Sequence, residues 1–122
     1  MSSVDSFGRE RDTRPWGSYT VLDDTAPDYK IKQIIVVPGH RLSYQRHAKR
    51  AEHWFIVSGT ATAILDGVAY ELSPGQSLDI GVGQAHRCEN HGETSVEFIE
   101  VQTGTYFGED DIVRLDDDYG RG

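Results

Sequence analysis

The sequence is poor in cysteine and has no long hydrophobic run. Its single cysteine, Cys88, excludes an intramolecular disulfide and hence a small disulfide-stabilised secreted fold. No apolar stretch approaches the ~20 residues that a membrane-spanning helix needs, and residues 1–17 lack the apolar core of a secretory signal. We therefore expect a cytoplasmic protein with no membrane partner.

Basic residues are also scarce, with 12 Lys and Arg against 20 Asp and Glu, and the formal net charge is −8. Nucleic acid is not an expected partner, because phosphate backbones are bound by basic surfaces. The charges are unevenly distributed: six acidic residues lie within 109–118, whereas six basic residues lie within 30–50. The basic region predicts a small anionic ligand, and solvated charges on loops are the alternative interpretation.

Short β-branched and aromatic runs separated by turn residues dominate the chain, without apolar helical periodicity. The best hairpin signal is Asp66-Gly67, because both residues tolerate the positive φ of a type I′ turn. The segment HAKRAEHW, residues 47–54, is predicted to be a loop. The predicted strands are 17–22, 29–37, 42–47, 53–57, 60–65, 68–72, 77–80, 86–89 and 95–102. So many short strands predict an all-β antiparallel sandwich or barrel.

The length of 122 residues fits one domain. Residues 1–13 are polar and predicted to form a flexible N-terminal segment, which leaves 14–122 for the domain. The acidic tail after Tyr106 carries an aliphatic cluster at Ile112, Val113 and Leu115. We therefore expect the tail to pack across the barrel.

A possible metal site lies around QRHAKRAEHWFIVSG, residues 45–59. Residues two apart on a strand face the same way, so Gln45 and His47 are expected to point together. Glu52 begins the next strand, and His86, which follows a glycine-rich turn, is the candidate fourth ligand. Imidazole, carboxylate and amide oxygen suit a divalent ion with Lewis-acid chemistry. The alternative is an accidental grouping on a solvated loop.

The spacing of these residues resembles the two motifs of the cupin family. The first motif runs Gly, five residues, His-x-His, three or four residues, Glu, six residues, Gly, and the matching residues are Gly39, Gln45, His47, Glu52 and Gly59. The second motif is matched by Gly75, Gly83, His86 and Asn90, with Gly81 where proline is usual. The resemblance implies that 14–122 is a single-domain cupin, a double-stranded β-helix or jelly-roll barrel.

A narrower resemblance, to type II phosphomannose isomerase, covers nearly the whole chain from Arg14. The segments that carry it are RPWGSY (14–19), YKIK (29–32), LSYQRHAKRAEHWFIVSGTA (42–61), HRCEN (86–90) and EVQTGTYFGEDDIVRLDDDYGR (100–121). In that family glutamine is normal at the position of Gln45. The departures that remain are Tyr44, where an aliphatic residue is common, and Gly81.

The resemblance implies an isomerase that interconverts mannose 6-phosphate and fructose 6-phosphate through a cis-enediolate. It implies one divalent ion, zinc first and manganese, iron, cobalt or nickel as alternatives, with Gln45, His47, Glu52 and His86 as its ligands. That cupin domain is often fused behind mannose-1-phosphate guanylyltransferase. No glycine-rich nucleotide-binding fingerprint occurs in this sequence, so we do not expect it to transfer GMP.

A base must move the substrate proton, and Lys32 and His53 are the candidates. Strand parity weakens the case for His53 as the base, since His53 faces away from the ligands if Glu52 faces them. Lys30 and Lys32 share a face with Ile34 and Val36. The opposite face, formed by Ile31, Ile35 and Val37, is equally compatible with burial.

The candidate substrate-binding residues are Arg41, Arg50 and Lys30. A guanidinium offers paired donors to phosphate oxygens, and a surface ion pair is the alternative for either arginine. Several residues match the family signature but receive no chemical role from the sequence, namely Arg14, Trp16, Asp111, Arg114, Tyr119 and Arg121.

Two other functions remain compatible with the sequence. One is a different cupin metalloenzyme, such as an iron dioxygenase, which would use the same ligands in a pocket without phosphate-binding cations. The other is a non-catalytic sugar-binding or regulatory cupin, for example a partner of a separate guanylyltransferase. A small-molecule sugar phosphate is the expected ligand, and exposed sheet edges favour a homodimer.

Overall fold

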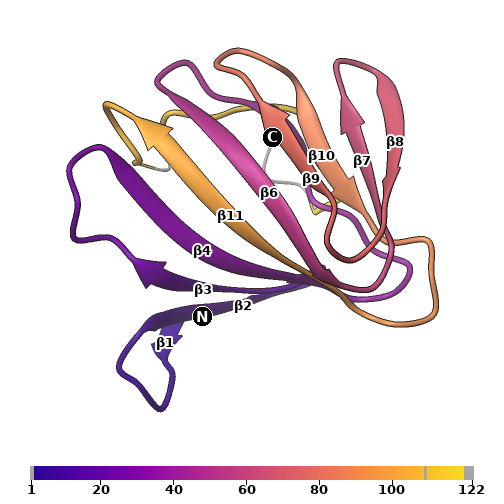
Figure 1. Ribbon diagram of the computed structural model, residues 1–122, viewed down its shortest axis with the longest axis horizontal. Helices are drawn as coiled ribbons and strands as arrows, with labels where there is room; N and C mark the ends of the chain where they lie inside the picture. The colour runs from indigo at the N-terminus through magenta and orange to yellow at the C-terminus, as the bar shows by residue number, and fades with distance from the viewer. Residues whose placement is uncertain (1, 109, 120–122) are drawn as a thin grey trace.

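The computed structural model describes residues 2–108 and 110–119, which form two antiparallel sheets (Figure 1). The strands are β1 (Ser2–Val4), β2 (Glu10–Arg14), β3 (Gly17–Asp23), β4 (Tyr29–Val36), β5 (Tyr44–Arg46), β6 (Arg50–Ser58), β7 (Ala61–Leu65), β8 (Val68–Leu72), β9 (Ser77–Ile80), β10 (His86–Glu89), β11 (Val96–Gly104) and β12 (Val113–Asp116). The predicted all-β class is confirmed. Within the described ranges, no helix is long and apolar enough to cross a membrane.

One sheet has seven strands in the order β1-β2-β3-β4-β11-β6-β9, and the other has five in the order β12-β5-β10-β7-β8. Figure 1 shows the two sheets curving toward one another around a common interior. Consecutive β7 and β8 form a hairpin whose turn residues, Asp66 and Gly67, have φ values of 48° and 81°. The predicted turn with positive φ at both positions is confirmed.

Burial alternates along the central strands, as expected for strands with one face on a core. On β6 the residues Arg50, Glu52, Trp54 and Ile56 are buried. On β11, Phe98 lies opposite Ile56 and is also buried. Every second residue of these strands therefore points to the interior.

The interior is apolar at one end and polar at the other. On β4, Val36 and Ile34 are followed by buried Lys32. In register with Lys32, Glu100 on β11 is also buried and lies opposite Trp54 on β6. The apolar end holds the hydrophobic core, which includes Trp54 itself. The hydrophobic core does not fill the polar end, and charged side chains line the interior there.

Three segments differ from the strand prediction. The loop predicted at 47–54 is wrong from Arg50 onward, because β6 starts there and pairs with both β11 and β9. The acidic tail forms β12, which pairs with β5, so its packing on the barrel is confirmed. Residues 2–13 include β1 and most of β2, whose backbone pairs with β3. Their flexibility and the boundary at residue 14 stay predictions, since pairing measures no motion.

Candidate functional site

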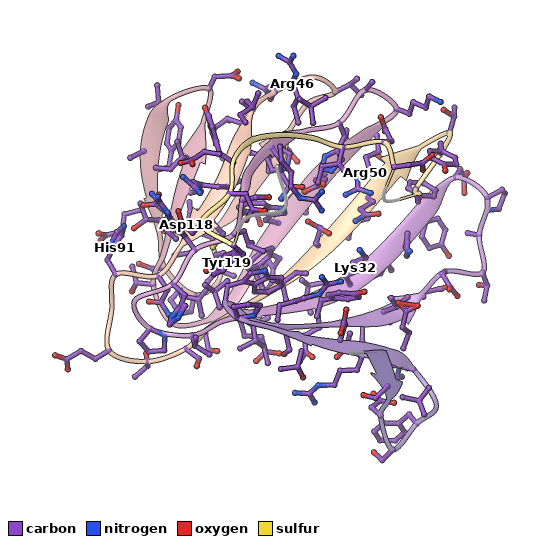
Figure 2. All side chains as sticks on the ribbon, turned by 180° about the vertical axis from the view of Figure 1, so that it is seen from behind. Lys32, Arg46, Arg50, His91, Asp118 and Tyr119 are labelled. Carbon is purple, nitrogen blue, oxygen red and sulfur yellow. The ribbon has the colours of Figure 1, made fainter. Side chains whose placement is uncertain are left out.

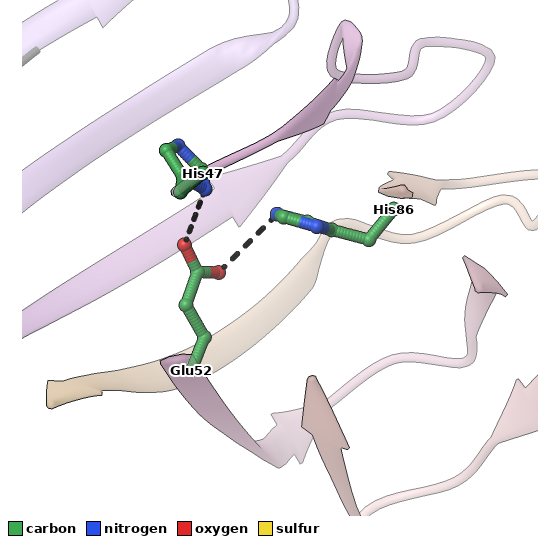
Figure 3. Close-up of side chains that lie close together, drawn as sticks. All are labelled: His47, Glu52 and His86. Atoms are coloured by element: carbon green, nitrogen blue, oxygen red, sulfur yellow. Dashed lines mark ion pairs between the residues drawn. The ribbon is translucent and has the colours of Figure 1, made fainter. Parts of the chain in front are cut away.

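Three buried side chains from different parts of the chain meet at the polar end of the interior (Figure 3). His47 lies in the connection between β5 and β6, Glu52 on β6, and His86 at the start of β10. One potential ligand atom from each lies within 4.8 Å of the others. These three residues, called the ligand triad below, are the pattern predicted from the sequence.

The distances within the ligand triad suit a divalent ion. His47 Nδ1 lies 3.5 Å from Glu52 Oε2, and His86 Nε2 lies 3.6 Å from Glu52 Oε1. Two ligands each about 2.1 Å from one ion, at a tetrahedral angle, are separated by about 3.4 Å. Two imidazoles and a carboxylate therefore lie at nearly the spacing that coordination requires.

The protonation of His86 also suits a metal ligand. Its Nδ1 lies 2.9 Å from the carbonyl oxygen of Gln84, and a carbonyl can only accept, so Nδ1 carries the hydrogen. The lone pair is then on Nε2, the nitrogen that faces Glu52. Burial lowers the pKa of His86 below its ordinary value, which favours the neutral ring that metals bind.

Gln45, the fourth predicted ligand, lies directly opposite His86 in the pairing of β5 with β10. Cross-strand neighbours project from the same face, so Gln45 is on the side of the sheet that carries His86. Its amide nitrogen donates to the Ser43 hydroxyl at 3.1 Å. The amide oxygen is therefore the atom that would ligate a cation.

Arg50 lies against the ligand triad and is buried, with a side chain only 4% exposed. Its Nη2 donates to His47 Nε2 at 2.8 Å, and its Nε donates to Glu52 Oε2 at 3.3 Å. The structure thus places Arg50 in the interior and not in a surface ion pair. Because a guanidinium can only donate, Nε2 of His47 holds the lone pair and Nδ1, the nitrogen nearest Glu52, carries the hydrogen. An ion bound at Nδ1 requires this hydrogen to move to Nε2, which the guanidinium must then leave.

A second buried carboxylate, Glu100, was not singled out from the sequence. The Trp54 indole Nε1 lies 3.0 Å from Glu52 Oε1 and 3.2 Å from Glu100 Oε1, so it bridges the two carboxylates. Gln102 Nε2 donates to the other oxygen of Glu100 at 2.8 Å. Burial, followed by the nearby Glu52 carboxylate, raises the pKa of Glu100 to about 7. The alternation of β11 was the signal that would have found it.

Lys32 faces the interior, which decides between the two orientations left open for β4. Its Nζ lies 4.8 Å from the centroid of the Tyr19 ring, a cation–π distance. Figure 2 shows Lys32 and Arg50 both extending between the sheets, whereas Arg46 points outward. Burial of Lys32 next to Glu100 follows from the register of β4 with β11.

Three predicted site residues lie elsewhere. His53 is exposed on the opposite face of β6, lies 2.6 Å from Asp79 and does not line the cavity, because strand parity points it away from Glu52. Arg41 is bound by the tail, with Nε 2.7 Å from Asp118 Oδ2, and is not part of the cavity wall. Lys30 shares the inward parity of Lys32 but likewise does not line the cavity.

Glu52 and His86 of the ligand triad, together with Gln45, line a cavity of about 150 Å³ between the sheets. Its charged lining residues are Arg14, Lys32, Arg50, Glu52, Arg87, Glu100 and Arg114. Cations outnumber carboxylates in this lining although the chain as a whole is acidic. The site therefore combines three residues of metal-ligating type with a pocket suited to an anion.

The acidic tail closes one side of this region, and Figure 2 shows Asp118 and Tyr119 on the segment that crosses it. The Asp111 carboxylate accepts from the backbone amides of residues 48 and 49, directly after His47. The Tyr119 hydroxyl donates to the carbonyl oxygen of Arg41 at 2.9 Å. Arg121, also noted in the sequence, lies outside the described residues.

Comparison with known proteins places the chain in a family. A model described as "Mannose-6-phosphate isomerase C-terminal" matches residues 6–117. "Alginate biosynthesis protein AlgA" of Pseudomonas aeruginosa is 50% identical over 108 residues, which are 88% of this chain and 22% of AlgA. A "Mannose-1-phosphate guanylyltransferase" of Salmonella montevideo is 48% identical over 108 residues, or 88% of this chain and 23% of the relative. The chain thus spans under a quarter of the length of these curated relatives.

A solved structure agrees on the fold. A sugar phosphate isomerase from a cupin superfamily, from Silicibacter pomeroyi, superposes with a TM-score of 0.71 at 17% identity, covering 88% of this chain and 82% of that one. At this identity the likeness concerns the fold alone. The cupin prediction and the narrower family resemblance are both confirmed. The chain belongs to the mannose-6-phosphate isomerase C-terminal family and has the cupin fold.

Proposed function

We propose that the protein is a metal-dependent aldose–ketose isomerase that interconverts mannose 6-phosphate and fructose 6-phosphate. The observation that carries the proposal is the convergence of three buried metal-type ligands with a cation-lined cavity. Family membership supports the same reaction class. A cupin dioxygenase would need the ligands but has no use for a cationic pocket.

The proposed ligands of one divalent ion are His47, Glu52 and His86, with the amide oxygen of Gln45 as the fourth. When bound, such an ion would supply positive charge to the adjacent C1 and C2 oxygens of the sugar as negative charge develops there. Zinc is the first choice for two imidazoles and a carboxylate, and manganese, iron, cobalt and nickel are compatible with the same donors.

The Trp54 indole and the Gln84 carbonyl orient this site. Trp54 Nε1 holds a Glu52 oxygen, and Gln84 fixes the tautomer of His86, so both ligands are set before substrate arrives. Removing a hydrogen-bond partner of a metal ligand commonly lowers metal affinity or activity about 10- to 100-fold. Arg50, released from His47 by ion binding, would then be a donor to the substrate.

Lys32 is the proposed proton carrier. It is the predicted base that lines the cavity, whereas His53 faces outward. In the forward direction its Nζ would take the proton from C2 of mannose 6-phosphate and return it to C1. The O2 hydroxyl proton passes to O1, which completes the conversion of the aldose to the ketose without any net gain or loss of atoms.

The test is turnover of mannose 6-phosphate by chelator-treated protein, with each divalent ion added in turn. We expect activity to return with at least one ion and to be lost in His47→Ala. His91→Ala is the matched control, because His91 is 68% exposed and bonded to Glu89 away from the cavity. Folded, metal-loaded protein without turnover would refute the isomerase and favour a sugar-binding or regulatory cupin.

A further inference from the structure

Three arginines of the cavity have no role in the reaction proposed above. Arg14, Arg87 and Arg114 line the same cavity as Glu52 and His86. The hydrogen bonds to His47 and Glu52 come instead from Arg50. The cavity therefore contains positive charge beyond what the triad engages.

Each of the three arginines keeps a buried donor without an acceptor. Among the described residues, Arg14 Nε, Arg87 Nη2 and Arg114 Nε are buried and have no hydrogen-bond partner. An unsatisfied buried donor on a charged group is destabilising, so several of them around one cavity are unusual in a native structure. A ligand with several acceptor oxygens would satisfy them together.

The arginines come from both sheets. Arg14 ends β2, and its guanidinium lies 5.8 Å from the centroid of the Tyr19 ring, which Lys32 also contacts. Arg114, on β12, lies opposite Gln45, which in turn lies opposite His86. Arg87, on β10, has a side chain only 6% exposed and donates Nε to the Leu42 carbonyl oxygen. Donors thus approach the cavity from opposite sides.

These donors match a phosphate group. A phosphate monoester carries close to two negative charges near neutral pH and accepts paired hydrogen bonds from guanidinium groups. In a hexose 6-phosphate the phosphate is at the opposite end of the carbon chain from C1 and C2. An anion subsite for it must therefore be built from cations other than the one at the ligand triad.

We infer that Arg14, Arg87 and Arg114 form the subsite that binds the phosphate of the substrate. The inference rests on the proposed function, in that it takes the ligand to be a sugar phosphate with its reacting carbons at the ligand triad. Arg41, the phosphate ligand first expected from the sequence, is instead paired with Asp118.

The test is binding of sorbitol 6-phosphate, which lacks a carbonyl group and cannot isomerise, measured by calorimetry on metal-loaded protein. Arg114→Gln is the main variant, because Arg14 and Arg87 also pair with Asp12 and Asp116. Loss of a charge-assisted hydrogen bond should raise Kd by roughly 10- to 100-fold. Inorganic phosphate should compete with sorbitol 6-phosphate in the unsubstituted protein.

Arg46→Gln is the matched control. It removes the same charge from an exposed residue of β5 that points away from the interior (Figure 2), so its Kd should be unchanged. An unchanged Kd in both Arg114→Gln and Arg14→Gln, with thermal unfolding showing both folded, would overturn the assignment. So would a failure of inorganic phosphate to compete.

The two proposals fail differently. Protein that binds sorbitol 6-phosphate through Arg114 but does not turn over mannose 6-phosphate would retain the subsite and refute the isomerase. Protein that turns over mannose 6-phosphate with the same KM after Arg114→Gln and Arg14→Gln would retain the isomerase and refute the subsite.

Discussion

Arg50 offers the sharpest test of the site, because its buried guanidinium bonds two of the proposed metal ligands. Its Nη2 and Nε bond His47 and Glu52 at 2.8 and 3.3 Å. At 3.3 Å, with an effective dielectric constant near 20, the attraction to Glu52 is about 5 kcal/mol. Removing one member of a buried ion pair typically costs ~3–5 kcal/mol. Arg50→Met should therefore destabilise the metal-free protein by this amount.

The assay is thermal unfolding in chelator and then in saturating divalent ion. A domain of this size changes its Tm by roughly 3 to 4 °C per kcal/mol, so Arg50→Met should unfold roughly 10 to 20 °C lower in chelator. An ion present at about 1,000 times its Kd adds about 4 kcal/mol to the stability of the folded state. In the variant no guanidinium has to be displaced, so the metal-induced rise in Tm should be larger than in the unsubstituted protein.

Arg46→Met is the control for this experiment, since an exposed arginine should change stability by no more than about 0.5 kcal/mol. Equal metal-induced shifts in Arg50→Met and the unsubstituted protein would refute the reasoning, because they would mean that the ion binds without displacing the guanidinium from His47 and Glu52. Turnover of mannose 6-phosphate should fall in Arg50→Met even when metal restores its Tm.

Three further predictions concern residues around the site and in the core. Trp54→Phe keeps an aromatic ring but removes the indole donor to Glu52, so metal affinity measured by competition with a chelating dye should fall about 10- to 100-fold. Asp111→Ala removes the acceptor for the amides of residues 48–49 and should lower the free energy of unfolding in urea by roughly 1–3 kcal/mol, with exposed Asp24→Ala as the control. Burial raises the pKa of Cys88 from 9.0 to about 12, so the folded state keeps the thiol proton where the unfolded chain releases it. The unfolding free energy should then fall as pH rises from about 9 to 12, and Cys88→Ala should remove that component of the slope; an unchanged slope would contradict the burial argument.

Some features of the fold were predictable because they depend on neighbours in the chain. The φ values of Asp66 and Gly67 follow from local backbone preferences, and the structure has the turn expected from them. Parity along β6 correctly placed Glu52 inward and His53 outward, because alternation is a local property of strands. The extent of β6 was predicted less well, since its first residues are strand only through pairing with β11.

The ligand triad was predicted from two motifs whose spacing is a property of the chain. By contrast, the orientation of Lys32 was undetermined, since both faces of β4 carry aliphatic residues that could be buried. Only the packing of β4 beside β11, with Lys32 opposite Glu100, decides which face is inside.

The sequence by itself determined most of the strands, the β7–β8 hairpin turn and the residue types of the ligand triad, because these depend on short-range periodicity and on residue spacing. The tertiary structure alone decided which cations belong to the cavity. Arg14 and Arg114 lie 100 positions apart in the chain, and nothing local distinguishes either from Arg41 or Arg46. They line one cavity because sheet pairing brings both ends of the chain to the same polar end of the barrel, where a buried donor requires an acceptor.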